Sequence, residues 1–281
     1  MKVGIVGLGL IGGSLAKAYK QAGAEVIGMD KNNLVTQFAQ MAEAIDAPMT
    51  DENMNECDFI LIAIPPVPAV EWLEENAHKL AESVMVIDCC GTKRYVCEAG
   101  FRLAEENRFT YVGGHPMAGL QYGGFKHSRY DLFEGAPFAA VVADHNDIKL
   151  LERIKKYILP AGFGKIVFCS AEEHDKIIAF TSQMAHVVSN AFIKSETAIN
   201  SGVQISAGSY RDFTRVAYLD ADMWTELFME NRDNLKFEID TLVAELKKYS
   251  EALENRDADR MRELLIEGRE RKVEVEKRCS N

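Results

Sequence analysis

A glycine-rich turn near the start of the chain most constrains its fold. Gly7-Leu8-Gly9-Leu10-Ile11-Gly12 directly follows a β-rich run at residues 2–6 and opens a helical pattern. In this context Gly7 permits a tight turn, Gly9 leaves room for a phosphate near the backbone, and Gly12 allows a helix to pack closely on a strand. The first helical turn also offers free N–H groups and the positive end of the helix dipole. We therefore expect a dinucleotide pyrophosphate to bind at Gly7, Gly9, Leu10, Ile11 and Gly12.

A carboxylate follows at the spacing that such a site requires. Asp30 ends the second β-rich run, where it can accept hydrogen bonds from the ribose hydroxyls of the nucleotide. A 2′-phosphate about 4 Å away would meet a repulsion of about 4 kcal/mol per unit charge at an effective dielectric constant of about 20. We expect NAD as the cofactor, although the neighbouring Lys31 leaves the strictness of NAD over NADP open.

β-rich runs alternate with helical patterns through the first 169 residues. This alternation predicts an α/β fold, with an N-terminal Rossmann-type, doubly wound and mainly parallel sheet covered by helices on both faces. The runs at residues 59–64 and 84–88 are apolar throughout, so these strands should be central and buried. The expected strands are 2–6, 25–30, 59–64, 84–88, 111–113, 137–143 and 165–169.

The β signal ends after residue 169. Ser170-Ala171-Glu172-Glu173 is typical of a capping box that opens a helix, and apolar residues recur at helical spacing between residues 224 and 246. We expect residues 1–169 to form the NAD-binding domain and residues 170–281 to form an all-helical domain for substrate binding and dimerisation. Its apolar surface predicts a homodimer through the helical part.

Composition disfavours several other classes of protein. The net charge is −11, and the chain has no Lys/Arg block that would attract nucleic acid. No apolar run has the roughly 18 residues of a membrane-spanning helix, and no secretory leader is recognisable. The six cysteines lack the paired spacing of a disulfide framework, and the histidines are too scattered to predict a metal site. We expect a cytoplasmic enzyme without a metal and without membrane or nucleic-acid partners.

The expected chemistry centres on one histidine. In a doubly wound sheet, the loops after the carboxyl ends of the strands converge on the nicotinamide. His115, within Gly114-His115-Pro116-Met117-Ala118-Gly119, is expected in such a loop after a strand at residues 111–113. An imidazole with a pKa of about 6.5 can accept a hydroxyl proton while hydride leaves the same carbon. Thr92, which follows the strand at residues 84–88, is expected to orient that hydroxyl or the imidazole.

The helical half supplies a candidate for carboxylate recognition. Arg215 is expected to hold a substrate carboxylate with paired hydrogen bonds, each worth about 1.5–3 kcal/mol. Arg211 is expected to be structural. Structural roles are also expected for His174, near the domain boundary, and for Trp224 and Asn231, in the core.

Taken together, several segments resemble the prephenate dehydrogenase family, in order over nearly the whole chain. They are the glycine turn, Gly91-Thr92-Lys93, residues 114–119, Leu132-Phe133-Glu134-Gly135, Thr181-Ser182-Gln183-Met184-Ala185-His186 and Phe213-Thr214-Arg215. The resemblance implies NAD-dependent oxidative decarboxylation of prephenate to 4-hydroxyphenylpyruvate in tyrosine biosynthesis.

The resemblance also implies roles for individual residues. His115 would be the base for the ring hydroxyl, Arg215 would bind a carboxylate, and His186 would lie near the side-chain end of the substrate. Thr92 stands where the family often has serine, so the hydroxyl is kept. Gln183, also assigned to substrate binding, stands where a histidine is common.

Other functions remain open at this point. An arogenate dehydrogenase would use the same parts on a substrate with an amine in place of the keto group. A β-hydroxyacid dehydrogenase or an imine reductase would have a catalytic lysine or a different loop in place of His115. An NAD-sensing protein without catalysis would lack His115 or Arg215, and both are present. Inhibition by tyrosine and any oligomer beyond a dimer also remain open.

Overall fold

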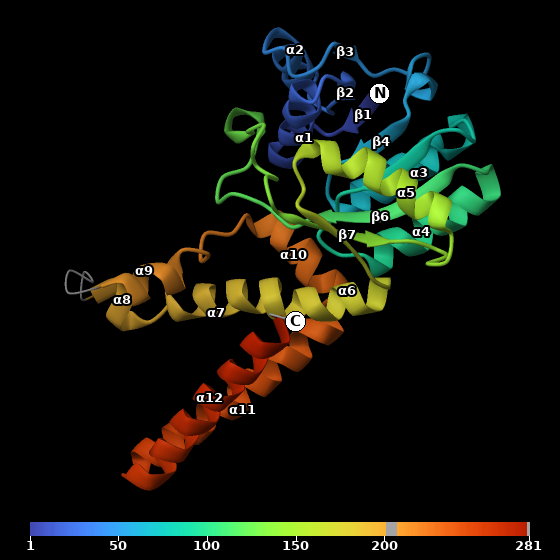
Figure 1. The fold of residues 1–281 in the computed structure, drawn as a ribbon. Helices are drawn as coiled ribbons and strands as arrows, with labels where there is room; N and C mark the ends of the chain where they lie inside the picture. The colour runs from blue at the N-terminus through green and yellow to red at the C-terminus, as the bar shows by residue number, and fades with distance from the viewer. Residues whose placement is uncertain (201–206, 280–281) are drawn as a thin grey trace. The chain divides into compact units, whose positions relative to one another are not determined.

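The structure is a computed structural model and describes residues 1–200 and 207–279. Within these residues, eight strands form one sheet in the order β3-β2-β1-β4-β5-β6-β7-β8 (Figure 1). The strands are β1 (Lys2–Val6), β2 (Glu25–Met29), β3 (Ala47–Pro48), β4 (Phe59–Ile62), β5 (Met85–Asp88), β6 (Thr110–Pro116), β7 (Pro137–Val141) and β8 (Lys165–Phe168). Neighbouring strands are parallel except for the antiparallel pair β6 and β7. The predicted doubly wound, mainly parallel sheet is therefore confirmed.

Helices cover both faces of this sheet. They are α1 (Leu10–Gln21), α2 (Asn33–Met41), α3 (Pro66–Asn76), α4 (Arg94–Asn107) and α5 (Ile148–Ile158). Residues of α1 and α5 share one core cluster with Phe59 and Leu61, and residues of α3 and α4 share the other with Ile60 and Ile62. Because alternate residues of β4 enter opposite clusters, all four of its side chains are buried, as its apolar sequence predicts.

Strand β6 is longer than the sequence indicates. Residues 110–112 pair with β5, and residues 113–116 then pair with β7, which places His115 opposite Ala139. The prediction that His115 lies in a loop is therefore wrong, because the antiparallel partner extends the strand beyond the end of β5. His115 is a strand residue whose backbone is fixed by the sheet.

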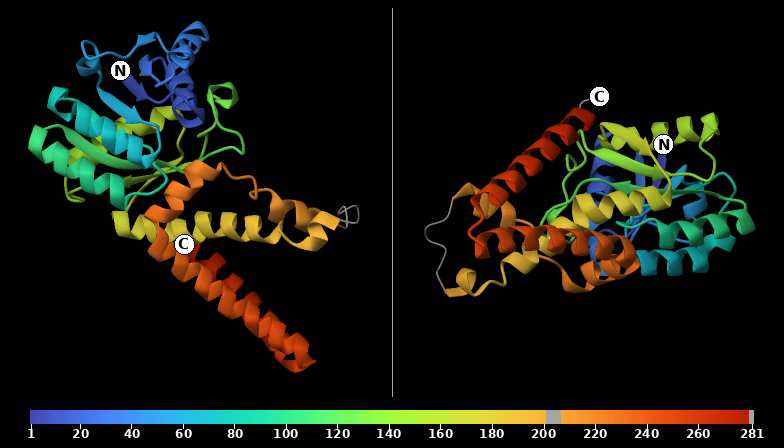
Figure 2. Two further views of the ribbon diagram at one scale, coloured as in Figure 1. Left: turned by 180° about the vertical axis from the view of Figure 1, so that it is seen from behind. Right: turned by 90° about the horizontal axis from the view of Figure 1, so that it is seen from below.

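The helical part begins where the sequence predicts it. The Ser170 side chain accepts from the backbone N–H of Glu173, and the Glu173 side chain accepts from the backbone N–H of Ser170. This confirmed capping box opens α6 (Ala171–Ile178), which continues through a π-helical segment (Ala179–Gln183) into α7 (Met184–Phe192). Short helices α8 (Glu196–Asn200) and α9 (Gly208–Thr214) precede α10 (Ala221–Glu230), which lies beside the α6–α7 rod (Figures 1 and 2).

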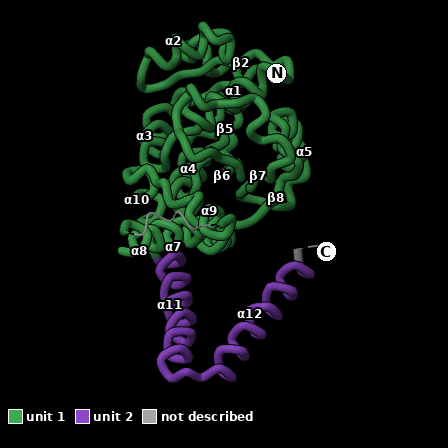
Figure 3. Tube along the Cα trace, turned by 90° about the vertical axis from the view of Figure 1, so that its left-hand side faces the viewer, with its two compact units in different colours: residues 1–232 green, residues 233–281 purple. Residues whose placement is uncertain are grey.

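Two compact units divide the chain at residues 1–232 and 233–281 (Figure 3). The second unit contains most of α11 (Arg232–Glu254) and all of α12 (Ala258–Cys279). The strands end at residue 168, but α6 to α10 belong to the same unit as the sheet. The predicted boundary between two domains after residue 169 therefore stays a prediction. No helix in the described part of the chain is long and apolar enough to cross a bilayer.

Candidate active site

The glycine turn has the geometry of a phosphate cradle. Gly7 has a φ of +85°, and a Cβ there would lie 2.8 Å from the carbonyl oxygen of Ala63. A Cβ on Gly12 would lie 1.8 Å from the carbonyl oxygen of Gly7, so that helix and turn meet only because both residues are glycine. Around a Cβ on Gly9, by contrast, no described atom lies within 4 Å. Helix α1 starts at the next residue, and the N–H groups of Leu10, Ile11 and Gly12 have no acceptor within the helix.

Asp30 is held against this turn. One carboxylate oxygen accepts from the backbone N–H of Leu8 at 2.9 Å, and the other accepts from that of Asn32 at 2.9 Å. The carboxylate is partly exposed at the end of β2 and keeps lone pairs for further donors. The open space at Gly9, the helix N-terminus and this carboxylate together fit a dinucleotide.

A buried ion pair joins the ends of β5 and β6. The Lys93 ammonium donates to Asp88 and, at 2.6 Å, to the carbonyl oxygen of Gly114, and both charged side chains are 0% exposed. Asp88 also accepts from the Tyr111 hydroxyl at 2.7 Å and from the backbone N–H of Gly114 at 3.1 Å. Burial disfavours the charged ammonium, but the adjacent carboxylate holds the pKa of Lys93 above its ordinary value. The pair thus fixes the backbone directly before His115.

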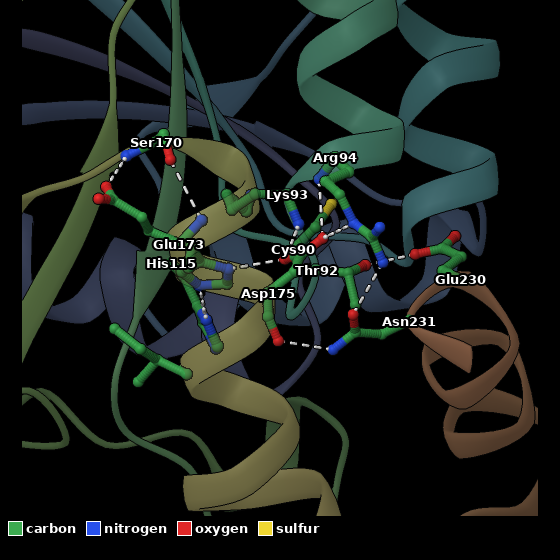
Figure 4. Close-up of polar contacts among 12 residues, drawn as sticks. Cys90, Thr92, Lys93, Arg94, His115, Ser170, Glu173, Asp175, Glu230 and Asn231 are labelled. Atoms are coloured by element: carbon green, nitrogen blue, oxygen red, sulfur yellow. Dashed lines mark hydrogen bonds and ion pairs between the residues drawn. The ribbon is translucent and has the colours of Figure 1, made fainter. Parts of the chain in front are cut away.

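His115 belongs to a relay of three side chains. Its Nδ1 lies 2.9 Å from Nε2 of His174, and Nδ1 of His174 lies 2.8 Å from a carboxylate oxygen of Asp175. Asp175 is 1% exposed and also accepts from the backbone N–H groups of Lys93 at 2.7 Å and Arg94 at 3.0 Å (Figure 4). Burial opposes the charge, but these donors hold the pKa of Asp175 below its ordinary value.

This relay determines where His115 carries its proton. An ionised Asp175 only accepts, so His174 donates through Nδ1 and presents a lone pair at Nε2. His115 then donates to His174 through Nδ1 and keeps the lone pair of its own Nε2 available. Burial, together with the positive charge that His174 and Lys93 can carry, lowers the pKa of His115 well below its usual value, so the imidazole is neutral at neutral pH. A neutral imidazole with a free lone pair is a competent base.

The sequence predicts a structural role for His174 and does not indicate its contact with His115. The ring of His174 contacts the candidate base directly and is 3% exposed. The signal was the adjacent pair His174-Asp175 directly after a helix cap, but nothing in the sequence places that helix beside β6.

Thr92 contacts a carboxylate that the sequence did not single out. Its hydroxyl donates to Oε2 of Glu230, the last residue of α10 (Figure 4). Burial raises the pKa of Glu230 to about 7; the Thr92 hydroxyl opposes that rise, and the charges of Glu226 and Asp175 add to it. One turn earlier on α10, Glu226 accepts from the backbone N–H of Val67 at 2.7 Å, near the start of α3. Two carboxylates of α10 therefore meet the edge of the nucleotide-binding part.

Gln183 is buried in a polar network. Its amide nitrogen donates to the carbonyl oxygen of Leu227 at 3.0 Å, and its amide oxygen accepts from Asn231 at 2.8 Å. Asn231 also donates to the carbonyl oxygen of Asp175 and accepts from the Arg94 guanidinium at 3.0 Å. Gln183 is 1% exposed, so its described contacts join the α6–α7 rod to α10.

His186 and Arg215 lie near each other in the helical part. Nδ1 of His186 donates to the carbonyl oxygen of Val216 at 2.9 Å, and its ring packs on Trp224 with centroids 4.0 Å apart. Burial lowers the pKa of His186, the Val216 carbonyl opposes this, and the positive charge of Arg215 adds to it. Arg215 itself is exposed at the end of α9. Within the described residues no hydrogen bond joins either side chain to Thr92 or His115. Helix α10 contacts both His186, through Trp224, and Thr92, through Glu230.

Comparisons with known proteins place the chain in a family. Residues 15–167 match the family model described as "Prephenate dehydrogenase, nucleotide-binding domain", and residues 170–267 match "Prephenate dehydrogenase, dimerization domain". The chain is 29% identical over 266 residues to a prephenate dehydrogenase of Bacillus subtilis. The matched region spans 92% of this chain and 71% of that relative. The chain is also 30% identical over 271 residues to a cyclohexadienyl dehydrogenase of Zymomonas mobilis, and this match spans 92% of this chain and 90% of that relative.

A solved structure agrees with the fold throughout. The prephenate dehydrogenase from Aquifex aeolicus, in complex with hydroxyphenyl propionate and NAD+, is 25% identical and superposes with a TM-score of 0.81 over 98% of each chain. The match includes the helical part as well as the sheet.

Proposed function

This chain belongs to the prephenate dehydrogenase family, and we propose that it oxidises prephenate with NAD to 4-hydroxyphenylpyruvate and carbon dioxide. The observation that carries the proposal is the Asp175–His174–His115 relay, which leaves Nε2 of His115 as a proton acceptor near the carboxyl end of β6. The cradle at Gly7, Gly9 and Gly12 supports dinucleotide binding.

The reaction can be written with these residues in their roles. Gly7, Gly9, Gly12 and Asp30 would hold NAD, which would supply a hydride acceptor for the ring carbinol carbon. His115 accepts the hydroxyl proton as that carbon becomes a carbonyl. The bond to the ring carboxylate then breaks, carbon dioxide leaves, and the bonding electron pair enters the ring and reaches the oxygen. That oxygen takes back a proton, which His115 can return, and the ring becomes a phenol.

Binding groups in the helical part complete the proposal. Arg215 would hold a substrate carboxylate, since its guanidinium is exposed beside the partly buried His186. Thr92 would contact the ring hydroxyl. Gln183 would contribute by holding α10 against the α6–α7 rod, because its amide is already bonded to Leu227 and Asn231.

One observation favours arogenate as a second candidate substrate. Because Nδ1 of His186 donates to Val216, its Nε2 carries a lone pair when the ring is neutral. A lone pair accepts from the ammonium of arogenate, whereas the keto group of prephenate needs a donor. The cyclohexadienyl dehydrogenase relative is consistent with a site that serves both acids.

The helical part is also proposed to form a homodimer. Apolar side chains stay exposed along the second unit, including Leu246 at 56%, Leu253 at 69% and Leu265 at 60%. Burial of such side chains against a second copy would stabilise a dimer. Sedimentation of the purified chain tests this directly, and a monomer at micromolar concentration would contradict it.

NADH formation tests the proposed reaction. Purified protein is assayed with prephenate and with arogenate, each with NAD and with NADP, and carbon dioxide release is followed in parallel. We expect turnover with NAD and release of one carbon dioxide per NADH. Absence of NADH formation with both acids would contradict the proposal, and turnover of arogenate alone would move the assignment to the second candidate.

A further inference from the structure

The contact between Thr92 and Glu230 joins two distant parts of the chain. Thr92 lies in the turn between β5 and α4 and is 1% exposed, and Glu230 ends α10. A threonine hydroxyl has one hydrogen, so it can donate in only one direction at a time. When Glu230 is ionised, that hydrogen points to Oε2, and Thr92 offers only lone pairs to any other neighbour.

The surroundings of Glu230 disfavour its charge. Oε1 is buried and has no hydrogen-bond partner in the part of the chain that the structure describes. The charged groups that act on it are Glu226 on its own helix, Asp175 on α6 and Lys93 in the same turn as Thr92. Tyr95 on α4 is also close enough that the charge of Glu230 raises the pKa of its phenol. Two of the charged groups are carboxylates, and the Lys93 charge is balanced by Asp88. The pKa of about 7 given above means that both protonation forms are populated at neutral pH.

We propose that Glu230 is a positioning residue that sets the direction of the Thr92 hydroxyl. Protonated Glu230 donates to Oγ1 of Thr92 and turns the threonine hydrogen towards the substrate oxygen. Ionised Glu230 accepts a hydrogen bond from the threonine hydroxyl, whose hydrogen then points away from the substrate oxygen. The inference rests on the proposed function, in which that oxygen is the one oxidised.

Only the protonated form supports the chemistry assigned to His115. The substrate oxygen loses its proton to Nε2 of His115 and gains negative charge, which a donor on the other side stabilises. With Glu230 ionised, Thr92 instead offers a lone pair, which competes with His115 for the substrate proton. The reaction requires a neutral His115 and a protonated Glu230. Its rate should therefore fall as the pH rises and Glu230 loses its proton.

Glu230→Gln is the decisive variant, because its amide nitrogen donates to Thr92 at every pH and its size is unchanged. In single-turnover measurements the wild-type rate of NADH formation should fall by about tenfold or more above a midpoint near pH 7, in keeping with the loss of one transition-state donor. In Glu230→Gln this alkaline fall should disappear, and the rate should stay at its acidic plateau. If the wild-type protein and Glu230→Gln both turn over either acid and show the same fall in rate at alkaline pH, the inference about Glu230 is overturned while the proposed function stands.

Two further variants separate positioning from a general structural role. Glu226→Gln keeps an acceptor for Val67 but removes a negative charge beside Glu230, so the alkaline fall should move to lower pH. In a Thr92→Val background, Glu230→Gln should leave the remaining rate and its pH profile unchanged. An unmoved midpoint in the first case, or an undiminished effect in the second, would contradict positioning through Thr92.

A measurement without turnover distinguishes this inference from the proposed function. If the wild-type protein oxidises neither acid, the proposed function fails. The carboxyl titration of Glu230, assigned by its loss in Glu230→Gln in carbon-13 NMR spectra, still reports the contact. Its midpoint should rise in Thr92→Val, because the hydroxyl stabilises the ionised form. An unchanged midpoint would overturn the coupling.

Discussion

Nε2 of His174 lies 2.9 Å from Nδ1 of His115 and thereby connects the candidate base to the buried carboxylate of Asp175. The histidine pair spans the change from sheet to helices, since His115 belongs to β6 and His174 to α6. The backbone of His115 is held by its pairing with β7, and the side chain that contacts its Nδ1 comes from the helical part.

Asp175→Asn should reverse this proton arrangement. The asparagine amide can donate to His174, which then carries its proton on Nε2 and forces His115 to protonate Nε2 as well. We expect kcat to fall by about 10²- to 10⁴-fold with little change in KM. His115→Asn should lower kcat to a similar level, and the double variant should fall little further.

Asp131→Asn is the matched control, because it removes a carboxylate from a surface pair with Arg129. Its kinetic constants should equal those of the wild-type protein. A wild-type kcat in Asp175→Asn, with NAD binding intact, would remove the relay from the mechanism.

Arg215→Ala should chiefly weaken substrate binding. Loss of charged hydrogen bonds worth about 1.5–3 kcal/mol corresponds to an increase in KM of about 10- to 100-fold. Arg211→Ala, another exposed arginine on α9, should change KM much less. Steady-state kinetics decide between the two, and an unaltered KM for both acids in Arg215→Ala would exclude the assigned contact.

Asp30→Asn should relax the preference for NAD. The amide keeps an acceptor for the turn at Leu8 but removes the charge that repels a 2′-phosphate, a repulsion of about 4 kcal/mol at about 4 Å before relaxation. We expect the ratio of kcat/KM for NAD to that for NADP to fall by at least about tenfold. Comparable efficiencies with both nucleotides in the wild-type protein would contradict the role of Asp30.

Acidification should destabilise the fold through the half-buried His115 and the buried His174. His115 and His174 have pKa values below the unfolded value of about 6.5, so below that pH the unfolded chain binds more protons. Their contribution is complete above pH 6.5 and is lost as the pH falls towards their folded values, by up to about 1.4 kcal/mol per pH unit for each proton.

Glu230 changes the pH dependence of the unfolding free energy in the opposite direction, because its raised pKa favours the folded state at acidic pH. The useful quantity is therefore the difference in unfolding free energy between the wild-type protein and His115→Gln, measured by urea denaturation from pH 7.5 to 5. The wild-type protein should lose more stability over this range. Parallel curves for the two proteins would show that His115 is not buried in its neutral form.

Lys93→Met should destabilise the protein strongly. It leaves the Asp88 carboxylate buried without its cation, which costs about 3–5 kcal/mol in comparable buried pairs. Lys79→Met removes the exposed pair with Asp51 and should cost less than about 1 kcal/mol. Denaturant unfolding measures both, and equal effects would mean that the buried pair contributes no more than a surface pair.

The sequence predicts most of the sheet because all strands except the two-residue β3 (Ala47–Pro48) have a local pattern of their own. The residues of β4 are apolar on both faces, and only a central parallel strand buries both. The glycine turn and the capping box at Ser170 are likewise local patterns with one physical reading. The length of β6 was not predictable in this way, because its last residues pair with β7, a contact between distant segments.

The same distinction explains the site. Thr92 stands out because it follows β5, and His115 stands out because it lies near the carboxyl end of β6. The roles of His174 and Glu230 depend on where α6 and α10 dock, which the neighbouring residues in the sequence do not determine. An acidic residue on an amphipathic helix is usually solvated, so nothing local distinguishes Glu230 from the many others in this chain.

The π-helical segment at Ala179–Gln183 has a consequence for how this chain can vary. A π turn accommodates one residue more than the α-helix around it, so a single deletion there would restore α geometry and leave the residues on either side on nearly the same faces. His174 would stay beside His115 and His186 would stay beside the Val216 carbonyl. A deletion in the regular α-helix that follows would instead rotate the later residues by about 100°. Phe180, which is 64% exposed, lies in the one segment of this rod where the chain can lose a residue without turning either histidine to another face.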